Sequence, residues 1–480
     1  MIGLAIFFAI HNFIRMFDNS VWGDEGIVVG LVRVSWGNML AGVAANGHSP
    51  FHYAFAWICV RLFGESGLVF HFSASLPYFI ILILAVTVIR KWFGNKTAVL
   101  FITLASLLNC AVTYNMEIRM YVWCELFILL SFLTLYKIYQ TQEIKYYFLM
   151  TLFGTAGAYS HYFALASIGI MYAVLLIYVC LREKKRIVAT LISGGAILGL
   201  LAPWLLYAHR VGGAVISNYS LGQVSWSECI EFIFYSKISW LLLVVFLFTI
   251  VLLFLYEYKA ICLKSVDEGK TCVKIQRGIY KKLSAEWMWV FSGILAVFGT
   301  IVAAEIISHL LYPIICLRYL YVSYVIIWLL MGYGIPRLKH GRIWTAILLV
   351  IIFCSCYPSL LDTIRTELDN NRRLENTLEV TQPIIDSDDY IYTNIVHFAW
   401  TVADAYYPKI AHNLFGHSEW WGSADLSELD SNVQYWLFLS KPITDDISQC
   451  LNEQSKTTEL IVDNGYIGTG NVWVYKVINN

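Results

Sequence analysis

Charged residues are scarce in this sequence, and long hydrophobic runs take their place. Only 14% of the 480 residues are Asp, Glu, Lys or Arg, whereas 59% are hydrophobic. Soluble domains average about 25% charged residues, so the composition argues against an ordinary soluble domain. Apolar runs of roughly 20 residues are long enough to cross a bilayer. The composition therefore predicts a polytopic α-helical membrane protein.

Three further absences narrow the class of protein. The formal net charge is zero, so there is no global positive field that would attract nucleic acid. None of the 11 cysteines forms a Cys-x-x-Cys pair, and many lie inside apolar segments. We interpret them as small buried hydrophobic residues rather than as zinc ligands or a disulfide framework. No internal repeat is evident, so a transporter built from inverted repeats gains no support from symmetry.

Hydrophobic segments alternate with polar ones along the first three quarters of the chain. We expect eleven membrane spans near residues 1–17, 66–89, 97–115, 119–136, 146–162, 163–181, 187–208, 238–256, 287–307, 318–335 and 343–360. The first segment has no basic leader and no small-x-small cleavage site after it, so we interpret it as a membrane helix rather than a signal peptide. Residues 1–360 are thus expected to form a transmembrane domain of about 11 helices.

Basic residues concentrate in alternate loops of this arrangement. Lys and Arg crowd the loops after the second, fourth, sixth, eighth and tenth spans, for example at Arg182–Arg186 and Arg337–Arg342. Cytoplasmic loops of membrane proteins carry such an excess. The prediction is a multi-pass protein of the plasma membrane whose N-terminus is cytoplasmic. The first long loop, residues 18–65, and the C-terminal tail are then extracytoplasmic.

Two extracytoplasmic regions are expected to have structure of their own. Residues 26–45 and 51–63 are predicted to form interfacial helices, interrupted where Pro50 bars regular helix. After residue 361 the composition becomes polar, with strand-like runs at 390–395, 433–439, 460–462 and 472–477. Residues 361–480 are predicted to form a small soluble α/β domain, which at roughly 100 residues is large enough to fold alone.

Ionisable residues gather at the predicted extracytoplasmic ends of the spans. Charge in or beside a membrane helix is costly, so each such residue is a functional candidate. The candidates are Asp24, Glu25, His48, His52, Glu117, Arg119, His161, His209, Arg210, Glu305, His309 and Arg318. Arg can grip a phosphate with paired N–H donors, and a carboxylate can take a proton from an attacking group. Glu25, a histidine such as His48 and a donor phosphate would together suit a divalent cation.

Structural roles remain open for several of these residues. Arg119 would form a local ion pair with Glu117, and Arg318 would extend from a helix end to the membrane surface. His161 would be hydrogen-bonded at a helix end, and His48 would support the turn at Pro50. Asp24 and Glu25 would be helix-capping acids, since acidic residues favour helix N-termini.

The order of these residues resembles that in the GT-C glycosyltransferases of the protein O-mannosyltransferase and aminoarabinose-transferase type. The similarity covers about residues 1–360 and rests on five motifs: Asp24-Glu25, His48-Ser-Pro-Phe-His-Tyr53, Glu117-Ile-Arg-Met-Tyr121, Ser160-His-Tyr162 and Leu317-Arg-Tyr-Leu320. The resemblance implies transfer of a sugar from a polyprenyl-phosphate donor to an extracytoplasmic acceptor, with inversion at the anomeric carbon.

The resemblance also implies a role for each matching residue. Asp24 would be the catalytic base, and Glu25 its partner in binding a metal or the acceptor. Arg119 and Arg318 would contact the donor phosphate. The substrate cavity would be lined by His48, Tyr53, Tyr121, His161 and Tyr319. The luminal β-trefoil domain of the mannosyltransferases has no obvious counterpart here, which weakens the case for a protein acceptor and leaves a lipid or an envelope glycan open.

Two other functions fit a membrane protein of this kind. A flippase or transporter of lipid-linked glycans would place charged residues at mid-membrane, whereas the central parts of most predicted spans are uncharged. A glycan polymerase or ligase usually relies on a large outward loop late in the membrane region. The long outward loop predicted here is the first one.

Overall fold

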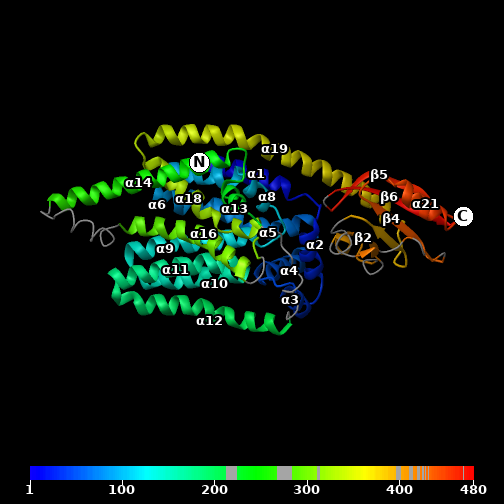
Figure 1. The fold of residues 1–480 in the computed structure, drawn as a ribbon, viewed down its shortest axis with the longest axis horizontal. Helices are drawn as coiled ribbons and strands as arrows, with labels where there is room; N and C mark the ends of the chain where they lie inside the picture. Colours follow the sequence, from blue (N-terminus) through cyan, green and yellow to red (C-terminus); the bar gives the residue numbers. More distant parts are fainter. Residues whose placement is uncertain are drawn as a thin grey trace. The chain divides into compact units, whose positions relative to one another are not determined.

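The computed structural model describes most of the chain and divides it into two compact units. The described residues are 1–211, 224–267, 284–310, 314–395, 402–409, 414–418, 422–423, 426, 429–430, 432–468 and 470–479. Unit 1 comprises Met1–Phe13, Leu40–Phe55 and Ser73–Leu361, and unit 2 comprises Ile14–Met39, Ala56–Phe72 and Asp362–Asn480. Helices dominate the first part of the chain, and the strands lie toward its C-terminal end (Figure 1).

The apolar runs of the sequence form long helices. The helices up to residue 211 are α1 (Ile2–Arg15), α2 (Gly23–Arg33), α3 (Trp36–Ala45), α4 (Phe51–Phe63), α5 (Gly67–Leu84), α6 (Arg90–Phe93), α7 (Asn95–Leu107), α8 (Asn109–Tyr114), α9 (Tyr121–Thr141), α10 (Ile144–Ser160), α11 (Tyr162–Arg182) and α12 (Ile187–Val211). Those after it are α13 (Trp226–Glu231), α14 (Ser239–Asp267), α16 (Ala285–Leu310), α17 (Leu317–Tyr321), α18 (Tyr324–Gly334), α19 (Gly341–Thr381), α20 (Ala403–Tyr406) and α21 (Asp445–Asn452).

The prediction of a polytopic helical membrane protein is confirmed. Among the described residues, seven helical stretches are long and apolar enough to cross a bilayer, and four further apolar helices are shorter. Every predicted span overlaps at least one observed helix. The total of eleven spans and their orientation in the membrane stay predictions.

Two predicted spans are interrupted in the structure. Residues 97–115 form α7 and α8, because Leu108 adopts an extended conformation with ψ of 139°. The adjacent Asn109 N–H donates to the carbonyl of Tyr235 at 2.9 Å, so a distant segment satisfies backbone that the helix releases. Residues 318–335 are likewise split between α17 and α18, where the Ser323 hydroxyl donates to the Leu320 carbonyl at 3.0 Å.

Close packing of helices α9, α16 and α18 forms the centre of unit 1. Trp289 of α16 stacks on Phe132 of α9 with ring centroids 4.5 Å apart, and its indole N–H donates to the Phe132 carbonyl at 2.9 Å. A Cβ at Gly293 would lie 2.6 Å from the Phe132 ring and 2.8 Å from Ile326 of α18. The absence of a side chain at Gly293 therefore permits this approach, as small residues do at membrane helix interfaces.

A six-stranded mixed sheet lies within unit 2. Its strands are β1 (Tyr390–Thr393), β2 (Leu414–Ser418), β3 (Gly422–Ser423), β4 (Tyr435–Leu439), β5 (Lys456–Ile467) and β6 (Gly470–Asn479), in the order β3-β2-β1-β4-β6-β5. The β1 strand runs parallel to β2 and β4, whereas β4 pairs antiparallel with β6 and β6 with β5. Each predicted strand-like run overlaps one of these strands, so the small C-terminal sheet is confirmed.

Alternating side chains of the sheet supply two apolar cores. Trp436 and Phe438 of β4 pack with Leu374 of α19, while Leu437 between them packs with Leu451 of α21. Successive residues of a strand point to opposite faces. The sheet is therefore covered by the polar-rich half of α19 on one face and by α21 on the other.

Candidate functional site

The buried guanidinium of Arg119 is the centre of the candidate site in unit 1. Arg119 precedes α9 by two residues and is 1% exposed. Its Nη1 donates to the Tyr53 hydroxyl at 3.2 Å, and its Nη2 lies 3.4 Å from Nε2 of His48. Tyr53 stands in the first turn of α4, after Pro50. The sequence thus brings two distant motifs, 48–53 and 117–121, into direct contact.

His48 is a neutral neighbour of this cation. Its ring lies 5.8 Å from that of Tyr53, nearly parallel to it. The pKa of His48 is lowered well below its usual value, first by burial and then by the positive charge of Arg119, with a further contribution from Arg318. A neutral imidazole has one nitrogen free to accept a hydrogen bond. His48 can therefore accept a hydrogen bond from Arg119 instead of repelling its charge. This contact gives His48 a role in addition to any support of the turn at Pro50.

An aromatic group adjoins the cation. The His161 ring lies 4.9 Å from Tyr319 and 6.1 Å from Tyr121, and the Arg318 guanidinium lies 5.7 Å from the Tyr319 centroid. Tyr121 is fully buried, and its hydroxyl has no hydrogen-bond partner among the described residues. An unmade bond of this kind costs about 1–3 kcal/mol, so the hydroxyl is available to a ligand.

His161 has a structural role as well. It separates α10 from α11, and its Nδ1 accepts the Phe163 N–H at 3.2 Å. A neutral ring that accepts through Nδ1 carries its proton on Nε2. The hydrogen bond expected of His161 at a helix end is therefore present. The other ring nitrogen, Nε2, can still donate a hydrogen bond.

Tyr114 and Tyr321 extend this aromatic group and were not predicted from the sequence. The Tyr114 ring lies 5.4 Å from Tyr121 and 4.7 Å from Tyr321. The Tyr321 hydroxyl donates at 2.8 Å to Glu125, a fully buried acid on α9. Because 16% of the chain is aromatic, one more tyrosine near a motif carried no distinguishing signal.

Asp24 and Glu25 belong to unit 2, where they occupy the first turn of α2. Glu25 is 5% exposed, and its Oε2 accepts the Trp22 N–H at 3.1 Å. A carboxylate at the third helical position that reaches back to the preceding backbone is a helix cap. Asp24 is partly exposed. Glu25 therefore has the helix-capping role that the sequence left open. The two acids differ in their surroundings, because Glu25 is buried and Asp24 is partly exposed.

The predicted metal ligands do not fit a metal centre made by the protein. The described residues contain no cluster of three or more His, Cys, Asp or Glu side chains that could hold an ion. The Glu25 carboxylate caps α2, and His48 faces the Arg119 cation. Divalent cations require several anionic or carbonyl oxygens, so we assign no reaction step to a metal.

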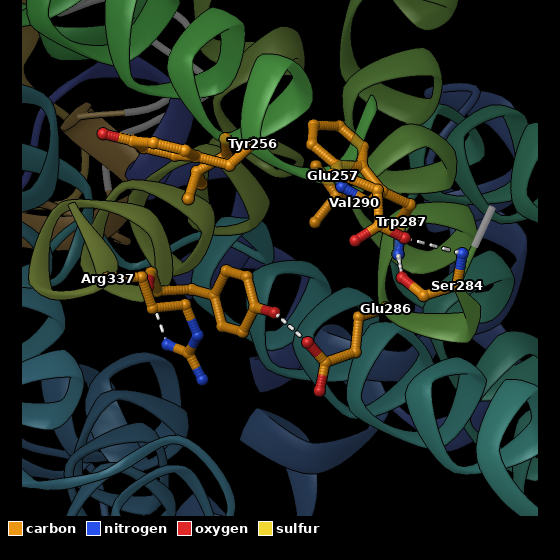
Figure 2. Close-up of a pocket in the computed structure, with 9 residues that line it drawn as sticks. Tyr256, Glu257, Ser284, Glu286, Trp287, Val290 and Arg337 are labelled. Carbon is orange, nitrogen blue, oxygen red and sulfur yellow. Dashed lines mark hydrogen bonds between the residues drawn. The ribbon is translucent and has the colours of Figure 1, made fainter. Parts of the chain in front are cut away.

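A cavity of about 230 Å³ lies in unit 1, and none of its lining residues is among those predicted for the site (Figure 2). It is lined by Leu253, Tyr256, Glu257, Ser284, Glu286, Trp287, Val290, Tyr333 and Arg337. The Tyr333 hydroxyl donates to Glu286 at 2.6 Å, and the Ser284 N–H donates to Glu257 at 3.1 Å. Its two acids thus already accept hydrogen bonds from neighbouring residues.

Comparisons with known proteins agree with the resemblance. Residues 47–207 match the family model described as dolichyl-phosphate-mannose-protein mannosyltransferase. The fold is similar to that of ArnT from Cupriavidus metallidurans in the apo state, with a TM-score of 0.58, 13% identity and coverage of 99% of this chain and 97% of that one. The undecaprenyl-phosphate-bound structure of ArnT from the same organism gives a TM-score of 0.54 at 12% identity, with the same coverage. No curated protein matches the sequence.

These matches confirm the predicted resemblance to membrane glycosyltransferases of the mannosyltransferase and aminoarabinose-transferase type. The chain has an ArnT-like fold. The segment that matches the family model contains five of the residues to which the resemblance assigns a role, namely His48, Tyr53, Arg119, Tyr121 and His161. The cluster around Arg119 is thus built largely from the part of the chain that resembles the family in sequence.

Proposed function

We propose that this protein is an integral membrane glycosyltransferase. It moves one sugar from a polyprenyl-phosphate donor to an extracytoplasmic acceptor, with inversion of the anomeric carbon. The acceptor is a lipid, an envelope glycan or a protein. Arg119 and Arg318 bind the donor phosphate, Asp24 is the general base, and His48, Tyr53, Tyr121, His161 and Tyr319 line the donor site.

The buried Arg119 cluster is the observation that carries this proposal. The guanidinium of Arg119 is 1% exposed, and it contacts the Tyr53 hydroxyl and the His48 ring, both of which are neutral. A phosphate is the natural ligand, because Arg can bind it with paired N–H donors. Arg318, whose guanidinium lies 5.7 Å from the Tyr319 ring centroid, supplies a second cation beside the aromatic group.

Support for a lipid-linked donor comes from the comparisons. One of the similar structures is ArnT bound to undecaprenyl phosphate, and the matching family model is described by a dolichyl-phosphate-linked mannose donor. Both names describe a phosphate on a polyprenyl chain. A donor of this class would reach the Arg119 cluster through the membrane, in keeping with the polytopic fold.

The reaction follows from the proposed roles. An acceptor hydroxyl or amine attacks the anomeric carbon from the face opposite the phosphate, and Asp24 takes the proton that the acceptor loses. The bond between the anomeric carbon and the phosphate oxygen breaks, and polyprenyl phosphate leaves with both electrons of that bond. Arg119 and Arg318 match the charge that develops on the leaving oxygen. One displacement without a covalent intermediate inverts the configuration, as in inverting glycosidases.

The test is transfer in proteoliposomes supplied with labelled lipid-linked sugar and an acceptor fraction. Asp24→Asn should abolish labelled product and leave expression and melting temperature unchanged. Glu25→Gln should retain part of the activity, because the amide oxygen can still accept the Trp22 N–H. The matched control is Asp388→Asn, which changes an exposed acid in unit 2. Full activity of Asp24→Asn would refute the assignment, and movement of donor across the bilayer without product would favour a flippase.

A further inference from the structure

The backbone that leads into the Asp24 turn is held by a tyrosine almost 400 residues later in the chain. The hydroxyl of Tyr406 accepts the Val21 N–H at 2.6 Å and donates to the Asn19 carbonyl at 2.8 Å. Tyr406 is the last residue of the short helix α20. One side chain therefore binds both a donor and an acceptor of the segment just before α2, which restrains that segment in two directions.

Helix α20 also contacts the other end of α2. Arg33, the last residue of α2, donates through Nη2 to the Ala405 carbonyl at 3.0 Å and pairs with Glu65. Arg61 of α4 donates to the carbonyls of Arg33 and Val34, both at 3.1 Å. The helix that carries Asp24 is thus fixed at its start and at its end, and adjacent residues of α20 contribute to both attachments.

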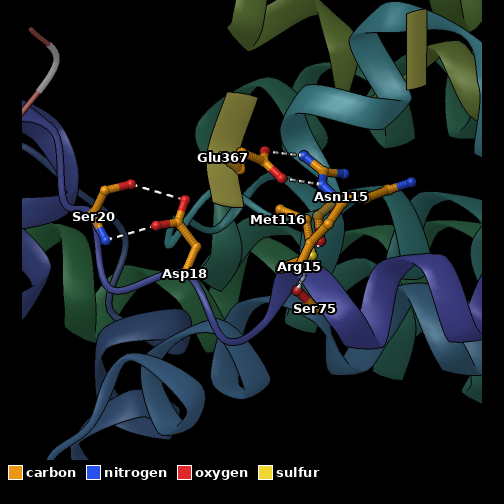
Figure 3. Close-up of polar contacts among 7 residues, drawn as sticks. All are labelled: Arg15, Asp18, Ser20, Ser75, Asn115, Met116 and Glu367. Atoms are coloured by element: carbon orange, nitrogen blue, oxygen red, sulfur yellow. Dashed lines mark hydrogen bonds and ion pairs between the residues drawn. The ribbon is translucent and has the colours of Figure 1, made fainter. Parts of the chain in front are cut away.

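The polar half of α19 supports the same segment. The Asn371 side-chain oxygen accepts the Asn19 N–H at 2.8 Å. Asp18 accepts hydrogen bonds from the backbone N–H and the hydroxyl of Ser20, both at 2.8 Å, and closes the turn (Figure 3). A Cβ at Gly67 would lie 2.9 Å from the Asp18 carbonyl oxygen. Residues 18–21 therefore have little room to move.

We propose that Tyr406 is a positioning residue for the transfer reaction. Its hydroxyl fixes residues 19–21 and so fixes the first turn of α2, from which Asp24 projects. This inference rests on the proposed role of Asp24 as the base. A catalytic group must be held within about 0.5 Å of its productive position, and a displacement of about 1 Å can cost on the order of 100-fold in rate. The C-terminal domain thus contributes to catalysis by holding α2, without touching the sugar.

The test compares Tyr406→Phe with Tyr475→Phe in full-length protein in proteoliposomes. Tyr475 is a matched control, because its hydroxyl accepts a backbone N–H, that of Ile443, at 3.0 Å elsewhere in the same domain. We expect Tyr406→Phe to lower kcat at least tenfold, with KM for the lipid donor within twofold. Tyr475→Phe should keep kcat within twofold. Melting temperatures of the two variants should agree.

A second measurement reports on the turn itself. Ser20→Cys in the Tyr406→Phe background should react with a water-soluble maleimide several times faster than Ser20→Cys alone. Asn371→Ala removes the side-chain oxygen that accepts the Asn19 N–H. This variant should also lower kcat, as Tyr406→Phe does. Unchanged labelling, or an equal loss of kcat in both Phe variants, would overturn the positioning role.

Asp24→Asn, measured in parallel, separates the two proposals. If Asp24→Asn is inactive and Tyr406→Phe has the wild-type kcat, the positioning role is wrong and the proposed function stands. If Asp24→Asn is active, the proposed function itself fails.

Discussion

Replacing Arg119 by lysine tests the proposed phosphate site without removing its charge. The Arg119 guanidinium contacts Tyr53 at 3.2 Å and His48 at 3.4 Å. An ammonium group has three donors at one point and lacks the planar fork that binds a phosphate through two N–H groups. Arg119→Lys should therefore keep the electrostatic attraction for the donor phosphate. It should lose the fixed geometry of the two N–H groups that bind the phosphate.

The magnitude follows from the bonds lost. A hydrogen bond to a charged group is worth about 1.5–3 kcal/mol, and each 1.36 kcal/mol corresponds to about a tenfold change in rate. Loss of one arm of the fork should lower kcat/KM by about 10- to 150-fold. Most of the loss should appear in kcat, because the leaving phosphate carries more charge in the transition state than in the bound donor.

The assay is initial transfer rate against donor concentration in proteoliposomes. Tyr53→Phe removes the hydroxyl that accepts from Arg119, and the double variant should lose less than the sum of the two single losses, because both changes break the same contact. Arg182→Lys is the control, since Arg182 is partly exposed at the end of α11 and lies 5.6 Å from the Tyr178 ring, outside the cluster. Wild-type kcat/KM in Arg119→Lys, or additive losses, would refute the phosphate role.

Three further predictions concern stability. Glu367→Gln should lower the melting temperature in detergent, because Arg15 is 2% exposed and donates twice to Glu367 at 2.7 Å, and breaking a buried ion pair costs about 3 kcal/mol. The double change Arg15→Met with Glu367→Leu should recover most of that loss. Gly293→Ala should cost about 1–3 kcal/mol through overpacking, whereas at Gly195 a Cβ meets no described atom within 4 Å, so Gly195→Ala should be neutral or stabilising. Burial raises the pKa of Asp18 from 3.8, so its contribution to stability is fully present below pH 3.8 and is lost as pH rises through the raised value. Asp18→Asn should therefore gain melting temperature relative to the wild type between pH 4 and pH 7, and a constant difference would contradict this.

Hydropathy located the membrane helices well because the bilayer leaves the backbone few alternatives. A spanning segment must satisfy its own hydrogen bonds, so an apolar run of sufficient length forms a helix. The break at Leu108 escaped prediction, since it depends on the Asn109 bond to the Tyr235 carbonyl, more than 120 residues away. The extension of α19 to Thr381 escaped prediction for a related reason. Its polar second half is amphipathic, and Leu374 there is fully buried against the sheet.

Site residues were predictable only where their chemistry is unusual for their surroundings. Arg119 and His161 stood out because charge beside a membrane helix is costly, and the cluster they belong to is present in unit 1. Tyr406, Glu367 and Asn371 gave no such signal, because polar residues are ordinary in a polar segment. Their contacts with residues 15–21 arise from long-range folding and could be found only in the structure.

The adjacent acids Asp24 and Glu25 illustrate how one motif divides between structure and chemistry. Consecutive residues of an α-helix point about 100° apart, so two adjacent carboxylates in one turn have different surroundings. Glu25, at the third position, accepts the Trp22 N–H at 3.1 Å and is buried. That bond satisfies backbone at the start of α2 and places a negative charge where the helix dipole favours it. Asp24, one position earlier, is partly exposed and is the carboxylate that we propose as the base. The cap at Glu25 and the Tyr406 contacts together restrain the turn that carries Asp24, the proposed base.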